Sequence, residues 1–186
     1  MKKQIFKLLI LSSFMISGCT ADLQTKNIIN TELKGQSVAV IQNFFNLTYV
    51  ENHAIAFGLF NNVEKSIRMP IIFALPILTT LLCLFFIWKI RKSKFRLLLP
   101  VFIILGGAYG NILDRAMNGF VTDFLHLHYF HKYNFYVFNV ADVLVNIGLI
   151  LILFQYKEFN KLLNTVFTKR TELERRWDNN DYQHFV

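Results

Sequence analysis

Two aspartates, Asp123 and Asp142, are the residues of this chain whose type and placement most favour chemistry. Asp142 lies within an apolar stretch and has no cationic residue near it in the sequence, so it is difficult to interpret as scaffold. Two carboxylates held a few ångströms apart cannot both ionise readily, and the pair then shares a proton. Such a pair can activate a water molecule as a base and afterwards protonate a leaving amine as an acid, with no metal or cofactor.

Further polar residues stand at the ends of apolar stretches, where ionisable groups are costly in lipid and usually functional. Asp22 and Lys26 are four residues apart with the acid first, which is the favourable order for a helical ion pair. Asn111, Asp114 and Arg115 share one face of a predicted helix. Asp22 and Asp114 each have a basic neighbour, so we interpret both acids as members of structural pairs rather than as catalysts.

Asn139 lies three residues before Asp142, on the same predicted helical face. A helix predicted over residues 135–156 places Asp142 seven residues in, about 10 Å from its start. Asn111 and Asn139 are open to two interpretations, as contacts between helices or as contacts to a substrate. The histidine-rich run at 126–131 has no cysteine beside it, and we interpret it as a loop at the membrane interface rather than a metal site.

The elements that must position these residues are four apolar segments of helix length. Hydrophobic residues make up 54% of the chain, including 20 Phe, which is more apolar surface than a soluble core of 186 residues could hide. Residues 36–60 alternate β-branched and aromatic residues with polar ones and predict a small extracytoplasmic antiparallel sheet between the first and second spans. We therefore expect a mainly α-helical integral membrane protein with four transmembrane helices, at about 5–23, 70–88, 97–117 and 135–156.

Lys and Arg residues set the predicted orientation. The amino end, the loop at 89–96 and the segment after the last span carry 14 of the 20. These parts are therefore predicted to be cytoplasmic, as an even number of spans allows, so the segments 22–69 and 118–134 face outward. We expect a single membrane domain over residues 1–168, followed by a polar cytoplasmic tail over 169–186.

Two other classes of function are less favoured. A net charge of +8 could indicate a nucleic-acid ligand, but Lys and Arg cluster between the apolar segments as membrane topology requires, so no nucleic-acid partner is expected. A proton-coupled transporter would also contain intramembrane acids and is the alternative function. Such a transporter needs polar groups through the whole depth of the bundle, whereas the inner part of the fourth span, at Leu149–Phe154, is apolar.

The first twenty residues allow a second interpretation. A basic start and an apolar stretch precede Ile16-Ser17-Gly18-Cys19, which fits the lipobox of bacterial lipoprotein precursors. Cleavage before Cys19 would make the chain a lipoprotein or an assembly factor. Such cleavage would also leave three spans with the amino end outside. The basic residues at the start would then not be needed to set the orientation of the mature chain. We therefore expect the first span to be retained.

Four blocks of residues carry a resemblance to a known family. In this order, and at the outer ends of four predicted spans, they resemble lipoprotein signal peptidase (signal peptidase II) along nearly the whole chain. The family pattern has a glycine where this chain has Ala54, which the backbone would tolerate at a negative φ. The blocks are Asp22–Lys26, Tyr49–Phe57, Gly110–Arg115 with Gly119 and Val121–Phe124, and Phe138–Asp142.

The resemblance implies a membrane aspartyl endopeptidase in the bacterial cytoplasmic (inner) membrane, with its active site at the extracytoplasmic face. The implied substrate is a diacylglyceryl-modified prolipoprotein, cleaved just before its lipidated cysteine. Membrane lipid is the other partner; no metal or cofactor is implied, and we expect a monomer. The implied roles are catalysis for Asp123 and Asp142, substrate binding or site shaping for Asn52, Asn111, Arg115 and Asn139, and structural support for Asp22, Lys26 and Asp114.

Overall fold

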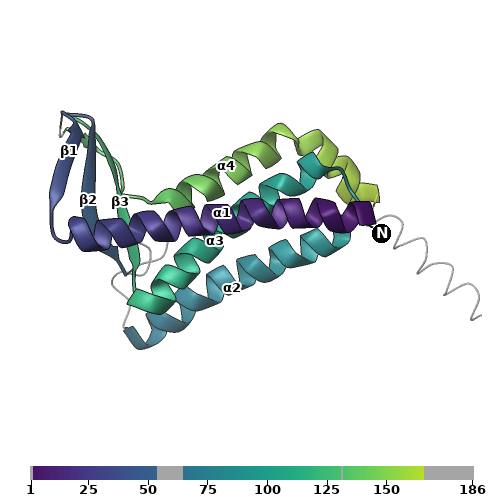
Figure 1. Cartoon of the computed structure of the whole chain (residues 1–186), viewed down its shortest axis with the longest axis horizontal. Coiled ribbons are helices and arrows are strands. Elements are labelled where there is room, and N and C mark those ends of the chain that lie inside the picture. Colours follow the sequence, from purple (N-terminus) through teal and green to yellow (C-terminus); the bar gives the residue numbers. More distant parts are fainter. Residues whose placement is uncertain (1, 54–64, 131, 166–186) are drawn as a thin grey trace, which may run out of the picture.

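The computed structural model describes residues 2–53, 65–130 and 132–165. Its helices lie side by side, and a sheet lies at the end of the bundle away from the amino terminus (Figure 1). Ala54, the last part of the predicted sheet at 54–60, and the tail at 169–186 lie outside the described residues. The elements are α1 (Lys2–Glu32), β1 (Ser37–Ile41), β2 (Phe45–Asn52), α2 (Lys65–Ile90), α3 (Phe95–Asn118), β3 (Val121–Tyr129), β4 (Tyr133–Asn134) and α4 (Val140–Phe154).

Among the described residues, α1 and α3 are long and apolar enough to cross a membrane. Helix α4 continues into a second helix, Tyr156–Thr165, after a bend of 75°, and the two helices together make a third candidate if they form one span. The predicted span at 70–88 lies within α2, whose shorter apolar part is Ile77–Ile90. The fold is therefore mainly helical, with two or three candidate spans in the described part of the chain.

Helix α1 runs without a break through the lipobox-like residues Ile16–Cys19. Beyond this motif, Asp22 and Lys26 are buried in the bundle. Before it, α1 packs tightly on α3, because a Cβ built on Gly106 would lie 2.9 Å from the carbonyl oxygen of Met15. Residues on both sides of the motif thus belong to the packed helix bundle.

Glycines on α3 allow its neighbours to approach closely. A Cβ built on Gly107 would lie 2.4 Å from the carbonyl oxygen of Ala141 on α4. One built on Gly110 would lie 2.5 Å from Oδ2 of Asp22 on α1. Both distances are far below van der Waals contact, so a side chain at either position would push the helices apart. Within one turn, α3 thus contacts α1 at Gly110 and the start of α4 at Gly107.

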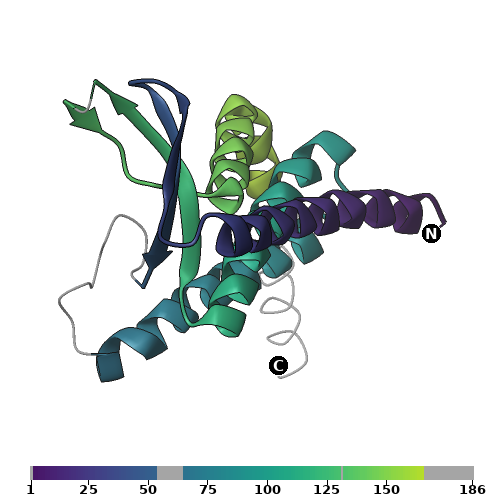
Figure 2. The ribbon, with the colours of Figure 1, turned by 60° about the vertical axis from the view of Figure 1, so that its left-hand side comes forward.

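The sheet is antiparallel, with strand order β1-β2-β3-β4. Strand β3 directly follows α3 and lies beside β2 (Figure 2). The predicted antiparallel sheet is confirmed for β1 and β2, but the histidine run predicted as a loop is partly strand, since His126 pairs with Asn46. The prediction failed there because the backbone of β3 finds its hydrogen-bond partners in a strand much earlier in the chain, which local sequence does not reveal.

Helix α4 begins at Val140, later than the predicted start at residue 135. The preceding Phe138 still belongs to the sheet edge, where it exchanges backbone hydrogen bonds with Leu125 at 2.8 and 3.1 Å. Asn139 then has an extended backbone (φ −131°, ψ −179°) and caps the helix. The prediction that Asp142 lies about 10 Å inside a helix is therefore wrong, because Asp142 stands in the first turn of α4.

Candidate active site

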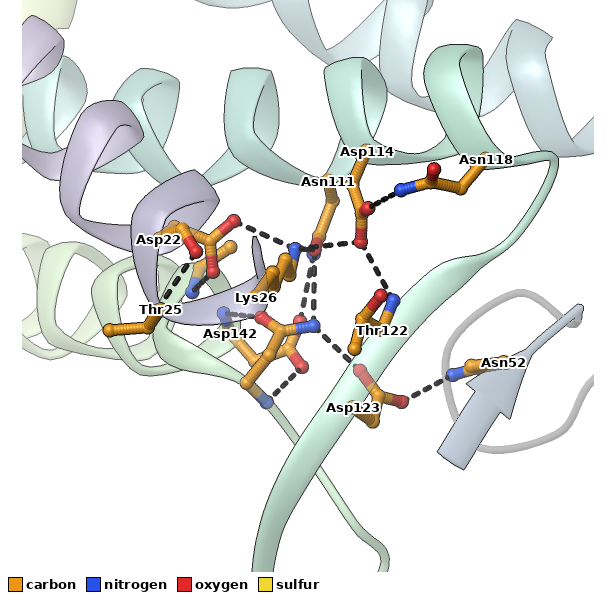
Figure 3. Close-up of polar contacts among 12 residues, drawn as sticks. Asp22, Thr25, Lys26, Asn52, Asn111, Asp114, Asn118, Thr122, Asp123 and Asp142 are labelled. Carbon is orange, nitrogen blue, oxygen red and sulfur yellow. Dashed lines mark hydrogen bonds and ion pairs between the residues drawn. The ribbon is translucent and has the colours of Figure 1, made fainter. Parts of the chain in front are cut away.

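Side chains from three helices and two strands meet at the end of the bundle that carries the sheet (Figure 3). Buried polar groups need hydrogen-bond partners, and here they supply one another. Asp22 and Asn139 are fully buried, and Asp123 is 3% exposed. The meeting residues are Asp22 and Lys26 from α1, Asn52 from β2, Asn111 and Asp114 from α3, Asp123 from β3, and Asn139 and Asp142 from the start of α4.

Asn139 joins the two candidate catalytic carboxyls. Its Oδ1 accepts from the backbone N–H of Asp142 at 3.0 Å, and its own backbone N–H donates to Oδ2 of Asp142 at 3.1 Å, which makes a capping box. A backbone N–H can only donate, so the amide must turn its Nδ2 away from it. That Nδ2 donates to Oδ1 of Asp123 at 2.6 Å. One asparagine therefore fixes the position of Asp123 relative to Asp142.

Two more asparagines donate hydrogen bonds to the carboxyl pair. Nδ2 of Asn52 donates to Oδ2 of Asp123 at 2.8 Å, and Nδ2 of Asn111 donates to Oδ1 of Asp142 at 3.0 Å. With the two contacts from Asn139, each of the four carboxyl oxygens accepts a hydrogen bond. Amide donors on every oxygen hold both carboxyls in place while leaving further lone pairs for a proton or a water molecule.

Asp114 holds the strand that carries Asp123. Its Oδ2 accepts from the backbone N–H of Thr122 at 2.7 Å, and its Oδ1 accepts from Nδ2 of Asn118 at 2.7 Å. Because Thr122 immediately precedes Asp123, this contact sets where β3 presents its acid. Arg115 is buried beside these groups and interacts electrostatically with Asp123, Asp114 and Asp142.

Asp22 ties α1 to the start of α4. The predicted ion pair with Lys26 is confirmed, with 2.7 Å between Nζ and Oδ2. Oδ1 of Asp22 also accepts from the backbone N–H of Ala141 at 2.8 Å, one residue before Asp142. Negative charge at a helix N-terminus is favourable, so Asp22 stabilises the turn that presents Asp142.

Three contributors to the site were missed from the sequence, namely Asn118, Thr122 and Ala141. Asn118 could have been found, because it lies one helical turn after Asp114. Thr122 and Ala141 contribute backbone N–H groups, and any residue other than proline carries one. Side-chain chemistry gives no signal for such contacts.

The environment of Asp123 favours its protonated form. The pKa of its carboxyl is raised from 3.8 to about 6, chiefly because the group is buried, and the charge of Asp142 contributes to the rise. Hydrogen bonds from Asn52 and Asn139 and the charge of Lys26 oppose this rise. The carboxyl therefore gains and loses its proton close to the pH range in which proteins work, as an acid catalyst requires.

A buried polar site at the end of membrane-length helices has the architecture of an integral membrane enzyme. A family model described as Signal peptidase (SPase) II matches residues 14–157. The chain therefore belongs to the signal peptidase II family and is a peptidase, as its resemblance predicts. Members of this family are integral enzymes of bacterial membranes, and the apolar helices of this chain agree with that placement.

Curated relatives and solved structures agree with the family. The lipoprotein signal peptidase of Clostridium tetani is 35% identical over 125 residues, which cover 67% of this chain and 77% of the relative. That of Fusobacterium nucleatum is 37% identical over 142 residues, covering 75% and 81%. A bacterial membrane enzyme solved by the in meso method at 2.3 Å resolution superposes with a TM-score of 0.65 at 29% identity, covering 81% of this chain and 87% of the other.

Proposed function

We propose that this peptidase removes the signal peptide of diacylglyceryl-modified prolipoproteins, cleaving just before the lipidated cysteine, with Asp123 and Asp142 as its catalytic residues. The contact of Asn139 with both carboxyls carries the proposal, because it holds two acids from separate elements at one place. Family membership supports the substrate class, since the named relatives are lipoprotein signal peptidases.

The proposed reaction begins with a water molecule between the two acids. Asp142 takes a proton from the water as the water oxygen attacks the scissile carbonyl carbon, and Asp123 gives its proton to the carbonyl oxygen. The C–N bond then breaks, Asp142 returns its proton to the leaving nitrogen, and a hydroxyl of the intermediate returns a proton to Asp123. The elevated pKa of Asp123 supports its starting role as the acid.

The proposed topology places this chemistry at the outer membrane surface. Four spans within a single domain over 1–168 would leave both termini cytoplasmic, with the tail at 169–186 inside. At the end opposite the site, Nζ of Lys7 donates to the carbonyl oxygens of Arg91 and Ser93, so the basic parts of the chain gather there. Because the clustered basic segments lie at the end opposite the site, this arrangement supports a cytoplasmic position for them and an outer position for the site. We further propose that the enzyme works as a monomer, without metal, cofactor or nucleic acid.

The purified full-length chain in lipid should convert a diacylglyceryl-modified precursor into a product whose first residue is the lipidated cysteine. Mass spectrometry of both products measures the cleavage position. A metal chelator should leave the rate unchanged, because two carboxyls and water suffice for the reaction. The same precursor without its diacylglyceryl group is the control and should remain uncleaved. Cleavage at another bond, or equal cleavage of both precursors, would contradict the proposed specificity.

In the profile of kcat/KM against pH, Asn52→Ala should move the alkaline limb to higher pH by about one pH unit. In the proposed reaction Asp123 must start protonated, so the rate falls as pH rises through its pKa, which is about 6. Asn52 donates to the ionised carboxyl and lowers that pKa, so its removal lets Asp123 keep its proton to higher pH. Asn46→Ala makes the same change on the same strand and should leave the limb in place. A downward shift for Asn52→Ala would contradict Asp123 as the acid.

A further inference from the structure

Lys26 is a buried cation in the middle of the site, with a relative exposure of 1%. Its Nζ lies 2.7 Å from Oδ2 of Asp22, 2.7 Å from Oδ1 of Asn111 and 3.5 Å from Oδ2 of Asp114. An ammonium group has three N–H donors and no acceptor, so three oxygens around it match its capacity. Of these three partners only Asn111 is uncharged, and it also contacts Asp142 of the candidate catalytic pair.

The contact with Lys26 requires one orientation of the Asn111 amide. Because the ammonium can only donate, Asn111 must turn its oxygen toward Lys26 (Figure 3). Its Nδ2 is thereby turned toward Asp142, to which it donates at 3.0 Å. The reverse orientation would set an NH₂ group against an ammonium and an amide oxygen against a carboxylate. Asn139 also donates to Oδ1 of Asn111, at 3.1 Å, but this bond is neutral and hence weaker.

We infer that Lys26 is a positioning residue for the reaction, because its ammonium group fixes the amide of Asn111 so that this amide donates to Asp142. Lys26 thus acts on a catalytic carboxyl through an intervening side chain, in addition to its ion pair with Asp22. The inference rests on the proposed function, in which Asp142 accepts the proton of the attacking water.

A direct replacement of Lys26 would leave Asp22 buried and unpaired, which strongly destabilises proteins. The test therefore uses an Asp22→Asn background, in which the single amide oxygen can accept either from the backbone N–H of Ala141 or from Lys26, and Asp114 remains beside Lys26 to balance its charge. Lys26→Met is added to this background, with and without Asn111→Ala. The four proteins form a double-mutant cycle that isolates the coupling between Lys26 and Asn111. Thermal unfolding in detergent checks that each protein is folded.

In the Asp22→Asn background, Lys26→Met should lower kcat about 10- to 100-fold, the loss seen when the hydrogen-bond partner that orients a metal ligand is removed. KM should change less than about threefold, because the reacting groups and not the substrate contacts are disturbed. With Asn111→Ala also present, Lys26→Met should cost less than about threefold. A loss of tenfold or more in the absence of Asn111, or no loss in its presence, would overturn the inference.

Asn111→Asp with Lys26 intact gives a second test if the methionine variant does not fold. The new carboxyl is a good partner for Lys26 but has no N–H to offer Asp142, so kcat should fall at least about 100-fold, as on loss of a catalytic donor. More than half of the normal rate would overturn the inference. Adding Asp142→Asn to the Asp22→Asn reference protein separates the two proposals. A reference protein still active with this change refutes the catalytic role of Asp142, whereas failure of the cycle alone refutes only the role of Lys26.

Discussion

Asp142→Asn and, separately, Asp123→Asn should each lower kcat by at least about 10⁴-fold, the scale of loss when a catalytic group that acts in concert is removed. Asparagine has the shape of aspartate but can neither take a proton from water nor give one to a carbonyl oxygen. At position 142 its oxygen can still accept from the backbone N–H of Asn139, so the start of α4 should form normally. Single-turnover cleavage of the lipidated precursor measures the loss.

Glu51→Gln is the matched control for these two variants. It makes the same acid-to-amide change next to Asn52, but its carboxyl contacts only the side chains of Tyr49 and His53 at the surface among the described contacts. Its rate should remain within about threefold of normal. If Asp123→Asn or Asp142→Asn kept more than a tenth of the normal rate while Glu51→Gln behaved as expected, the residue concerned could not be half of a catalytic pair.

The chemistry-bearing residues could be found in the sequence because lipid makes them conspicuous. Asp22, Lys26, Asp114, Asp123 and Asp142 stand in or beside apolar stretches where a charge is costly, so each needs a reason to be there. The order of Asp22 and Lys26 along a helix also predicts their ion pair, since residues four apart always face each other. Such local relations follow from helix geometry alone.

The start of α4 could not be placed by hydrophobicity, because apolar residues continue on both sides of it. Phe135 to Phe138 extend the apolar run of α4 backwards, yet Phe138 pairs with strand β3. A start signal was present, since Asn139 and Asp142 have the spacing of a capping box. That spacing also suits one face of a continuous helix that begins at residue 135. The correction moves Asp142 from the interior of a helix to its first turn.

Contacts between distant elements were beyond the reach of sequence reasoning. The bond from Lys26 to Asn111 joins residues 85 positions apart, and that from Ala141 to Asp22 joins residues 119 positions apart. Each depends on the packing of one helix against another, which is set by backbone approach at glycines rather than by any local pattern. Most side chains of the site could thus be named in advance, but the network that orients them could not.

Gly107→Ala should lower both the stability of the protein and its activity. The added methyl carbon would lie 2.4 Å from the carbonyl oxygen of Ala141. This oxygen is main chain and cannot swing aside, so α4 must move away from α3 by at least about 0.6 Å to reach the shortest tolerable contact. Overpacking of this kind costs about 1–3 kcal/mol. Asp142 directly follows Ala141 and must move with it.

Displacement of a reacting group by about 1 Å can cost about 100-fold in rate, so kcat should fall about 10- to 100-fold with little change in KM. Gly18→Ala is the matched control, because its new methyl carbon would meet only the tip of the Leu144 side chain, at 3.0 Å, and that side chain can rotate. Its activity should stay within about threefold of normal. Thermal unfolding and single-turnover rates of both variants, measured in the same lipid, distinguish the two contacts. Equal behaviour of the two variants would show that the close contact between α3 and α4 at Gly107 does not position Asp142.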